Sequence, residues 1–178
     1  DFLMDSEYKK ALKEAMELLA KDERVVFMGY DVAYASKGWG SFADIDEEKL
    51  IETPVAENLM TGIAIGMALE GYRPLLFFER HDFMLIALDA LSNHLDKLEA
   101  LSEGEFKAPV IIRAVVGGSK PMNPGMLHTQ DFTEIFKMLF KFIKVHEVID
   151  AEDIINQYKQ ALSEDKTVML VERKDLYH

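Results

Sequence analysis

The sequence contains no cysteine and comparatively few basic residues. Without cysteine, a disulfide framework, a thiolate metal site and a cysteine nucleophile are all excluded. The chain has 20 lysines and arginines against 32 aspartates and glutamates, which gives a formal net charge of −12 at pH 7. Because a surface that follows phosphates needs a basic stripe, this balance argues against nucleic acid and against an anionic membrane as partners.

Long apolar runs are also missing. No stretch reaches the roughly 18 apolar residues of a membrane span. The start, DFLMDSEYKK, has neither the basic end nor the apolar stretch of a signal peptide. We therefore expect a cytoplasmic protein with no membrane partner. One interpretation makes Met4 the natural first residue and residues 1–3 an addition. The Walker phosphate loop, a GxGxxG after a strand and a GxSxG elbow are absent too.

The sequence does contain an alternation of short β-branched runs with helical patterns over its 178 residues, 49% of which are apolar. This alternation predicts a single α/β domain, a doubly wound and mainly parallel sheet with helices on both faces. The expected strands are 25–28, 50–52, 74–78, 109–116, 142–148 and 168–172. The expected helices are 8–20, one after Thr53, 82–101, 131–140 and 153–162. Ligands of such sheets bind beyond the carboxyl ends of the strands, which directs attention to the loops that follow residues 28, 52, 78 and 116.

One carboxylate, Glu57, stands in the first turn of the helix expected after Thr53. If Thr53 is the N-cap and Pro54 the first helical residue, a capping box would put the acid at Ala56, so Glu57 misses it by one position. A carboxylate that stabilises the helix dipole is one interpretation. A partly buried acid that shares a hydrogen bond with a ligand nitrogen is the other.

The same helix carries Gly62 and Gly66, four residues apart on one face. Since a glycine inside a helix costs up to about 1 kcal/mol relative to alanine, we expect another backbone to approach closely there. Packing on the sheet of the same chain and packing at a site edge or subunit interface explain the pair equally well.

FFERHDF, residues 77–83, places four ionisable side chains at another strand end. Asp82 could cap the following helix while its neighbours are solvated. Alternatively, Arg80, His81 or Phe83 could face a pocket.

Three polar residues fall at four-residue spacing on one face of the following helix: Asp89, Asn93 and Lys97. Such stripes are usually solvated faces. A metal site made of His81, Asp82 and His94 fits no known ligand spacing, so no metal site is expected. The long loop 117–130 holds His128, which is either an acid/base group that titrates near neutrality or an ordinary surface histidine.

TPVAENLMTGIAIGMALEGYRP, residues 53–74, resembles the pyrimidine-binding domain of transketolase-like thiamine-diphosphate enzymes. It is most similar to the beta subunit of the decarboxylating component of 2-oxo acid dehydrogenases, which shows a T-P-I/V-A/S-E start, a glycine-dotted helix and a G-x-R-P exit. The resemblance continues through DF at 82–83, SEGEFKAPVIIRAVVGG at 102–118 and LHTQ at 127–130, where the family has His-Ser-Gln. It covers nearly the whole chain in one order.

The resemblance implies roles for four residues. Glu57 matches the family glutamate that hydrogen-bonds the ring nitrogen of the cofactor's aminopyrimidine. Phe83 matches the aromatic residue that packs against that ring, and Val55 matches a neighbour that lines it. His128 matches the loop histidine near the substrate, where it can transfer protons. Glu57 and His128 are therefore the expected catalytic residues, and Val55, Glu57 and Phe83 the expected cofactor contacts.

The sequence also departs from the family pattern. Tyr30 follows Gly29 where the family commonly has an acid, and His81 beside Arg80 replaces a residue that is usually aromatic or small. Tyr30, Arg80 and His81 lie where the resemblance puts the substrate, so the identity of the substrate stays open.

The chain ends at His178 and lacks the Gly-Asp-Gly…Asn site that holds a magnesium-bound diphosphate, while the family continues into a further C-terminal domain. The resemblance therefore implies that this chain binds the pyrimidine half of thiamine diphosphate. A diphosphate-binding subunit or domain, which carries Mg²⁺, would complete a homodimer or heterotetramer. The expected reaction is oxidative decarboxylation of a 2-oxo acid, with the isolated chain inactive. A transketolase-type ketol transfer subunit and a non-catalytic assembly domain that retains the fold are the alternatives.

Overall fold

The computed structural model describes residues 6–120 and 122–178, so the interpretation of Met4 and residues 1–3 lies outside the described part. Its centre is one sheet of six strands, all of them parallel, in the order β2-β1-β3-β4-β6-β5. The strands are β1 (Val25–Gly29), β2 (Leu50–Glu52), β3 (Arg73–Phe78), β4 (Ile111–Val116), β5 (Lys144–Glu147) and β6 (Val168–Arg173). The expected doubly wound α/β fold is confirmed.

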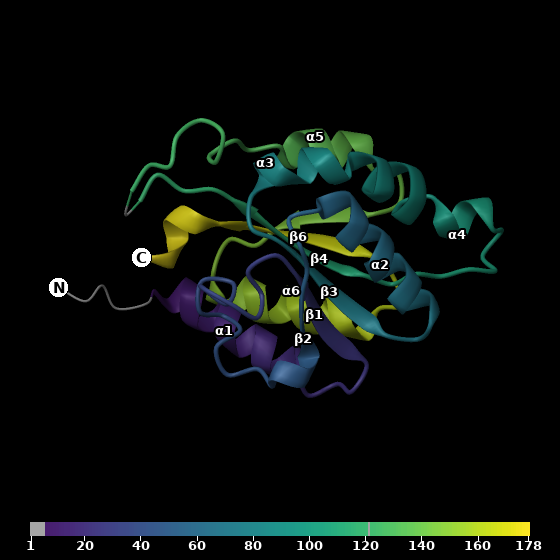
Figure 1. The fold of residues 1–178 in the computed structure, drawn as a ribbon, viewed down its shortest axis with the longest axis horizontal. Helices are drawn as coiled ribbons and strands as arrows, with labels where there is room; N and C mark the ends of the chain where they lie inside the picture. Colours follow the sequence, from purple (N-terminus) through teal and green to yellow (C-terminus); the bar gives the residue numbers. More distant parts are fainter. Residues whose placement is uncertain (1–5, 121) are drawn as a thin grey trace.

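Helices cover both faces of this sheet (Figure 1). On one face lie α1 (Glu7–Leu19) and α6 (Ala151–Ser163), and on the other lie α2 (Glu57–Leu69), α5 (Thr133–Leu139) and the helical run 81–101. Side-chain caps fix the start of the first pair. Ser6 accepts a hydrogen bond from the backbone of Lys9, and Asp150 accepts one from the backbone of Asp153.

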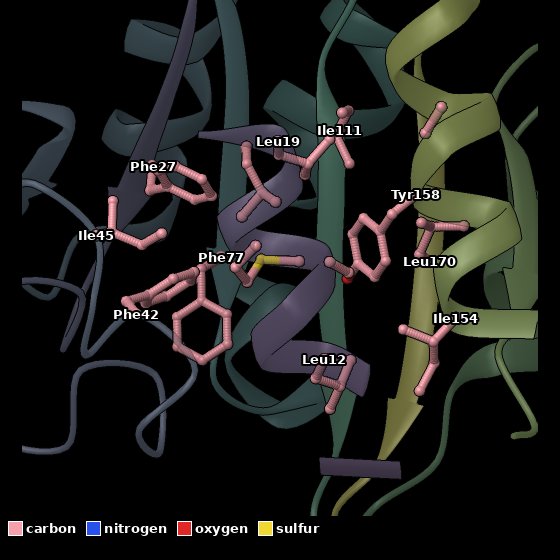
Figure 2. Close-up of a cluster of buried hydrophobic side chains, with 14 of the residues drawn as sticks. Leu12, Leu19, Phe27, Phe42, Ile45, Phe77, Ile111, Ile154, Tyr158 and Leu170 are labelled. Carbon is pink, nitrogen blue, oxygen red and sulfur yellow. The ribbon is translucent and has the colours of Figure 1, made fainter. Parts of the chain in front are cut away.

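The hydrophobic core forms two layers, one on each face of the sheet. Alternate residues of a strand point to opposite faces, so Phe27 belongs to the layer under α1 and α6 while Met28 belongs to the other. Figure 2 shows the first layer, where Leu12 and Leu19 of α1 lie over Phe77 and Ile111 of the sheet. Strands β1, β3 and β4 are buried along their whole length, as expected for a parallel sheet covered on both faces.

The helix after β2 begins at Glu57 and not at Pro54, the first helical residue assumed for a capping box. Ala56 is its N-cap and makes no side-chain cap hydrogen bond, so Glu57 is the first helical residue. Thr53 instead donates its backbone N–H to the carbonyl of Gly29 (2.9 Å), which keeps it with the sheet. Thr53 as N-cap, with Pro54 in the helix, was therefore wrong.

The predicted single helix over 82–101 was also wrong. The run consists of α3 (His81–Met84), a 3₁₀ turn (Leu85–Ala87), a π-helix (Asp89–Leu95) and α4 (Leu98–Leu101). The buried carboxylate of Asp96 follows the π-helix and accepts hydrogen bonds from the backbone N–H groups of residues 141–143 at 2.8–3.0 Å. This tertiary anchor fixes where the π-helix ends and the run breaks, and helical periodicity cannot reveal it. Strands 109–116 and 142–148 and helix 131–140 were predicted slightly too long, and the 3₁₀ turns Glu47–Lys49 and Lys174–Tyr177 were not predicted.

Candidate functional site

The loops at the carboxyl edge of the sheet carry most of the residues expected at a site. Strands β2, β1, β3 and β4 are neighbours in that order, so their carboxyl ends form a continuous edge. Helix α2 with Glu57 follows β2, Tyr30 follows β1, Arg80 and Phe83 follow β3, and the loop with His128 follows β4.

Glu57 is a buried acid with no internal partner. Its residue is 5% exposed, and its carboxylate makes no hydrogen bond or ion pair with any residue in the described ranges 6–120 and 122–178. Its backbone carbonyl accepts a hydrogen bond from the Thr61 hydroxyl at 2.8 Å. A first-turn acid gains about 0.3–1 kcal/mol from the helix dipole at the surface and up to about 2 kcal/mol when it is partly buried, whereas taking an unpaired carboxylate out of water costs several kcal/mol. Its placement favours the interpretation that Glu57 meets a ligand.

The structure brings Phe83 and His128 together. Their rings meet edge to face, with centroids 5.6 Å apart and an interplanar angle of 86°. The Nδ1 atom of His128 is buried and has no hydrogen-bond partner among the described residues. A Cβ atom on Gly117 would lie 1.7 Å from the carbonyl oxygen of His128, so only glycine lets this loop fold back onto the end of β4.

Val55 and Tyr30 lie exposed at the same edge of the sheet, with 65% and 43% of their surface exposed.

His81, in contrast to these two residues, is not at the surface. It is fully buried, its Nδ1 accepts a hydrogen bond from the backbone of Phe132 (3.1 Å), and its ring packs edge to face on Phe136. Burial lowers the pKa of His81 to about 4, so it is neutral at pH 7. His81 therefore holds the start of α5 in place and does not line the surface beside His128.

Asp82 does not cap a helix, because Arg80 occupies the N-cap position of α3. One carboxylate oxygen of Asp82 accepts a hydrogen bond from the side-chain amide of Gln130 at 2.7 Å. This contact ties the far end of the His128 loop to α3. The sequence contained its two members, but their separation of 48 positions gave no local signal.

Glu52, at the end of β2, is a site residue that the sequence reasoning missed. Its carboxylate accepts hydrogen bonds from the backbone N–H groups of residues 31–33 at 2.7–2.8 Å.

The loop that Glu52 holds, which follows β1, has a strained backbone. Four residues other than glycine have positive φ there: Asp31, Ala35, Lys37 and Trp39. Such strain persists only where the surroundings enforce it, and it is concentrated at functional sites. In the sequence, the signal for Glu52 was that it is a single acidic residue at the end of the expected strand 50–52.

Comparison with known proteins agrees with this geometry. Residues 5–178 match the family model described as the transketolase pyrimidine-binding domain. The chain belongs to this family. The resemblance inferred from the motifs is thereby confirmed.

Two curated relatives of this family member are beta subunits. Pyruvate dehydrogenase E1 component subunit beta, mitochondrial, from Ascaris suum is 32% identical over an alignment of 177 positions that covers 95% of this chain and 47% of that protein. 2-Oxoisovalerate dehydrogenase subunit beta from Bacillus subtilis is 28% identical over an alignment of 173 positions that covers 94% of this chain and 50% of that protein. The chain thus spans about half the length of the curated relatives it matches.

A solved structure described as split gene transketolase, inactive beta4 tetramer, has the same fold. Its TM-score is 0.68 at 21% sequence identity, over 93% of this chain and 49% of that chain. At this identity the likeness shows the fold alone.

The glycines of α2 in this family member do not pack on its own sheet. A Cβ atom on Gly62 or Gly66 would meet nothing within 4 Å in the described structure. The interpretation that they allow close packing within the chain was therefore wrong. Leu59 and Ile63 are exposed beside them, so this face of α2 is apolar and has no cover from the described residues.

The remaining expectations concern the polar stripe, metals and membranes. In the stripe, Asn93 donates to Asp89 at 2.9 Å, whereas Lys97 turns to the carbonyl of Ser92 at 2.5 Å. Within residues 6–120 and 122–178, no three His, Asp or Glu side chains come close enough to hold a metal ion. No helix in the same ranges has the length and apolar character needed to cross a membrane.

Proposed function

We propose that this chain binds the pyrimidine half of thiamine diphosphate and forms, with a diphosphate-binding partner, an enzyme that oxidatively decarboxylates a 2-oxo acid. The observation that carries the proposal is Glu57, a residue that is 5% exposed at the first position of α2 and whose carboxylate makes no hydrogen bond to a described residue. By the resemblance of residues 53–74 it corresponds to the family glutamate, and the chain as a whole matches the family over residues 5–178. The names of the two beta-subunit relatives favour a 2-oxo acid over a sugar as the substrate.

The residues present fit an aminopyrimidine ring. Glu57 offers an unpaired carboxylate to a ring nitrogen, Phe83 offers an aromatic surface, and the exposed side chain of Val55 offers an apolar one. When bound, thiamine diphosphate would supply the nucleophilic carbon that attacks the substrate carbonyl, which is chemistry that no side chain here provides.

The side chains of this chain position groups and hold protons. The low exposure of Glu57 strengthens its hydrogen bond to a ring nitrogen, because water competes weakly in a site of low dielectric constant. Because Nδ1 of His128 is enclosed by the chain, His128 is proposed to exchange a proton with the substrate through its other ring nitrogen, Nε2. Phe83 holds the His128 ring by an edge contact and thereby limits its orientation. Tyr30 and Arg80 are proposed to lie near the substrate.

The diphosphate and Mg²⁺ are assigned to the partner because the sequence has no Gly-Asp-Gly…Asn segment. This assignment, the proposal that the isolated chain is inactive and the proposed cytoplasmic location rest on the sequence. The name of the Ascaris suum relative places that protein in the mitochondrion.

Calorimetric titration with thiamine diphosphate and Mg²⁺ tests whether this chain and its partner each bind one half of the cofactor. The partner is a chain that carries the Gly-Asp-Gly…Asn segment. We expect saturable binding by the mixture and none by this chain alone, because the diphosphate contributes the charged contacts. Tight magnesium-dependent binding by the isolated chain would contradict the proposal, as would a mixture that binds no cofactor although the two chains associate.

The glycine face of α2 is proposed to be where the partner subunit packs. Replacing Gly62 by alanine should stabilise the isolated chain by up to about 1 kcal/mol, since the added methyl group meets open space and alanine favours the helix. Gly62→Leu should weaken association with the partner at least tenfold. Denaturant unfolding and sedimentation check the two effects. Association of Gly62→Leu with unchanged affinity would place the interface elsewhere.

A further inference from the structure

Two cations from distant parts of the chain lie against one tryptophan ring. Arg80 follows β3, and Lys174 is the first residue of the 3₁₀ turn (Lys174–Tyr177) that follows β6. The guanidinium carbon of Arg80 lies 4.7 Å from the centroid of Trp39, and the ammonium of Lys174 lies 3.9 Å from it. Lys174 also lies 4.4 Å from the ring of Tyr177. Attraction to the ring faces partly offsets the loss of water around the cations.

Neither cation has a counter-ion among the described residues, although the chain has 12 more acids than bases. Arg80 donates one hydrogen bond, to the carbonyl of Glu79 (3.3 Å), and its Nε is buried without a partner. Lys174 makes no hydrogen bond or ion pair within residues 6–120 and 122–178. Partly buried cations are normally paired, because an unpaired one loses hydration without compensation.

The surrounding charges leave the pair unneutralised. Burial foremost, followed by the charges of Arg80, Lys9 and Arg113, lowers the pKa of Lys174 to about 7. The charge of Glu79 acts in the opposite direction, and burial raises the pKa of Glu79. At pH 7 Lys174 is therefore about half protonated, and an added anion would favour its charged form beside Arg80.

We propose that Arg80, Lys174 and Trp39 form a binding site for a carboxylate or phosphate group of the substrate. The site adjoins the His128 loop. A Cβ atom on Gly117 would lie 3.1 Å from Cδ of Arg80, and the same glycine contacts the carbonyl of His128. Trp39 is held in place by a backbone with positive φ (53°), which is strain of the kind found at ligand sites. Only the attribution of the anion to the substrate rests on the proposed function, because the site itself needs neither the cofactor nor the partner.

Fluorescence of Trp39, the sole tryptophan of the chain, reports on this site directly. The chain is titrated with malonate and, separately, with inorganic phosphate, at an ionic strength held constant with chloride. We expect a saturable change in emission at pH 7, and the probe that binds more tightly identifies the group as carboxylate or phosphate. The affinity for malonate, whose charge is constant in this range, should fall between pH 7 and pH 9, because Lys174 then loses its proton and with it the charge that attracts the anion.

Two variants and a matched control make the test specific. Lys174→Met and Arg80→Gln should each weaken the response at least tenfold, with circular dichroism and thermal unfolding as checks of the fold. Lys141→Met removes an exposed lysine that also lies over an aromatic ring, that of Phe142 at 5.3 Å, and should leave the response unchanged. A wild-type protein without a saturable response, or folded variants that respond like the wild type, would overturn the proposal. Neither result would bear on whether Glu57 binds the cofactor.

Discussion

Replacing Glu57 by glutamine should lower kcat of the assembled enzyme by about 100-fold or more while leaving the fold intact. Removal of a positioned acid/base group typically costs about 10²–10⁴-fold in rate. Glutamine has nearly the same volume as glutamate, and Glu57 makes no side-chain hydrogen bond to a described residue that the change could break. Steady-state decarboxylation of a 2-oxo acid by the variant with its partner, cofactor and Mg²⁺ measures the effect.

The same helix provides the control. Glu70 is the exposed C-cap residue of α2, so Glu70→Gln makes the same chemical change away from the carboxyl edge of the sheet. It should retain wild-type activity. If Glu57→Gln were as active as Glu70→Gln, the role assigned to Glu57 would have to be abandoned.

Arg113→Met should destabilise the chain by about 3–5 kcal/mol, because it leaves a buried carboxylate without its cation. Arg113 and Glu172 are both fully buried and joined by two hydrogen bonds of 2.5 and 3.0 Å. Burial alone would lower the pKa of Arg113, but Glu172 reverses the effect and raises it, so Arg113 is charged. Tyr158 donates a further hydrogen bond to Glu172 at 3.0 Å. Chemical denaturation measures the loss, and Tm should fall by roughly 10 °C.

An exposed pair of similar geometry is the matched control. Arg24 donates two hydrogen bonds, of 2.7 and 3.0 Å, to the carboxylate of Asp22, but it lies at the surface. Arg24→Met should change the unfolding free energy little, since solvent screens such pairs. Equal stability losses in the two variants would mean that burial does not set the strength of the Arg113 pair.

The sequence was sufficient for the sheet because its strands are short, continuous apolar runs. β4 is an example: the run IIRAVV is buried at every position, and only a strand covered on both faces needs that pattern. The interior arginine of this run gave no signal of its partner. Glu172 lies 59 positions away, and neighbouring residues cannot reveal such a pairing.

The break in the helical run 81–101 was not predictable for the same reason. Its sequence has helical periodicity, but Asp96 is held by backbone groups 45–47 positions further along. Tertiary contacts of this kind override local propensity.

For the candidate site, the resemblance of the sequence to the family pointed to Glu57, Phe83 and His128 as site residues and implied a role for each. It could not show that the Phe83 and His128 rings touch, or that Glu57 has no partner and Gly62 and Gly66 no neighbour within residues 6–120 and 122–178. Nothing in the sequence distinguishes Lys174 from an ordinary solvated lysine. The cation pair at Trp39 exists only because β3 and β6 flank β4 in the sheet.

The most direct test of the central claim is the rate of 2-oxo acid decarboxylation by this chain, by its diphosphate-binding partner and by the two combined, each with thiamine diphosphate and Mg²⁺. The proposed division of the cofactor between two polypeptides predicts no turnover by either alone and cofactor-dependent turnover by the mixture, reduced about 100-fold or more by Glu57→Gln. Turnover by this chain alone, or a mixture that associates and binds the cofactor but decarboxylates no 2-oxo acid, would contradict it.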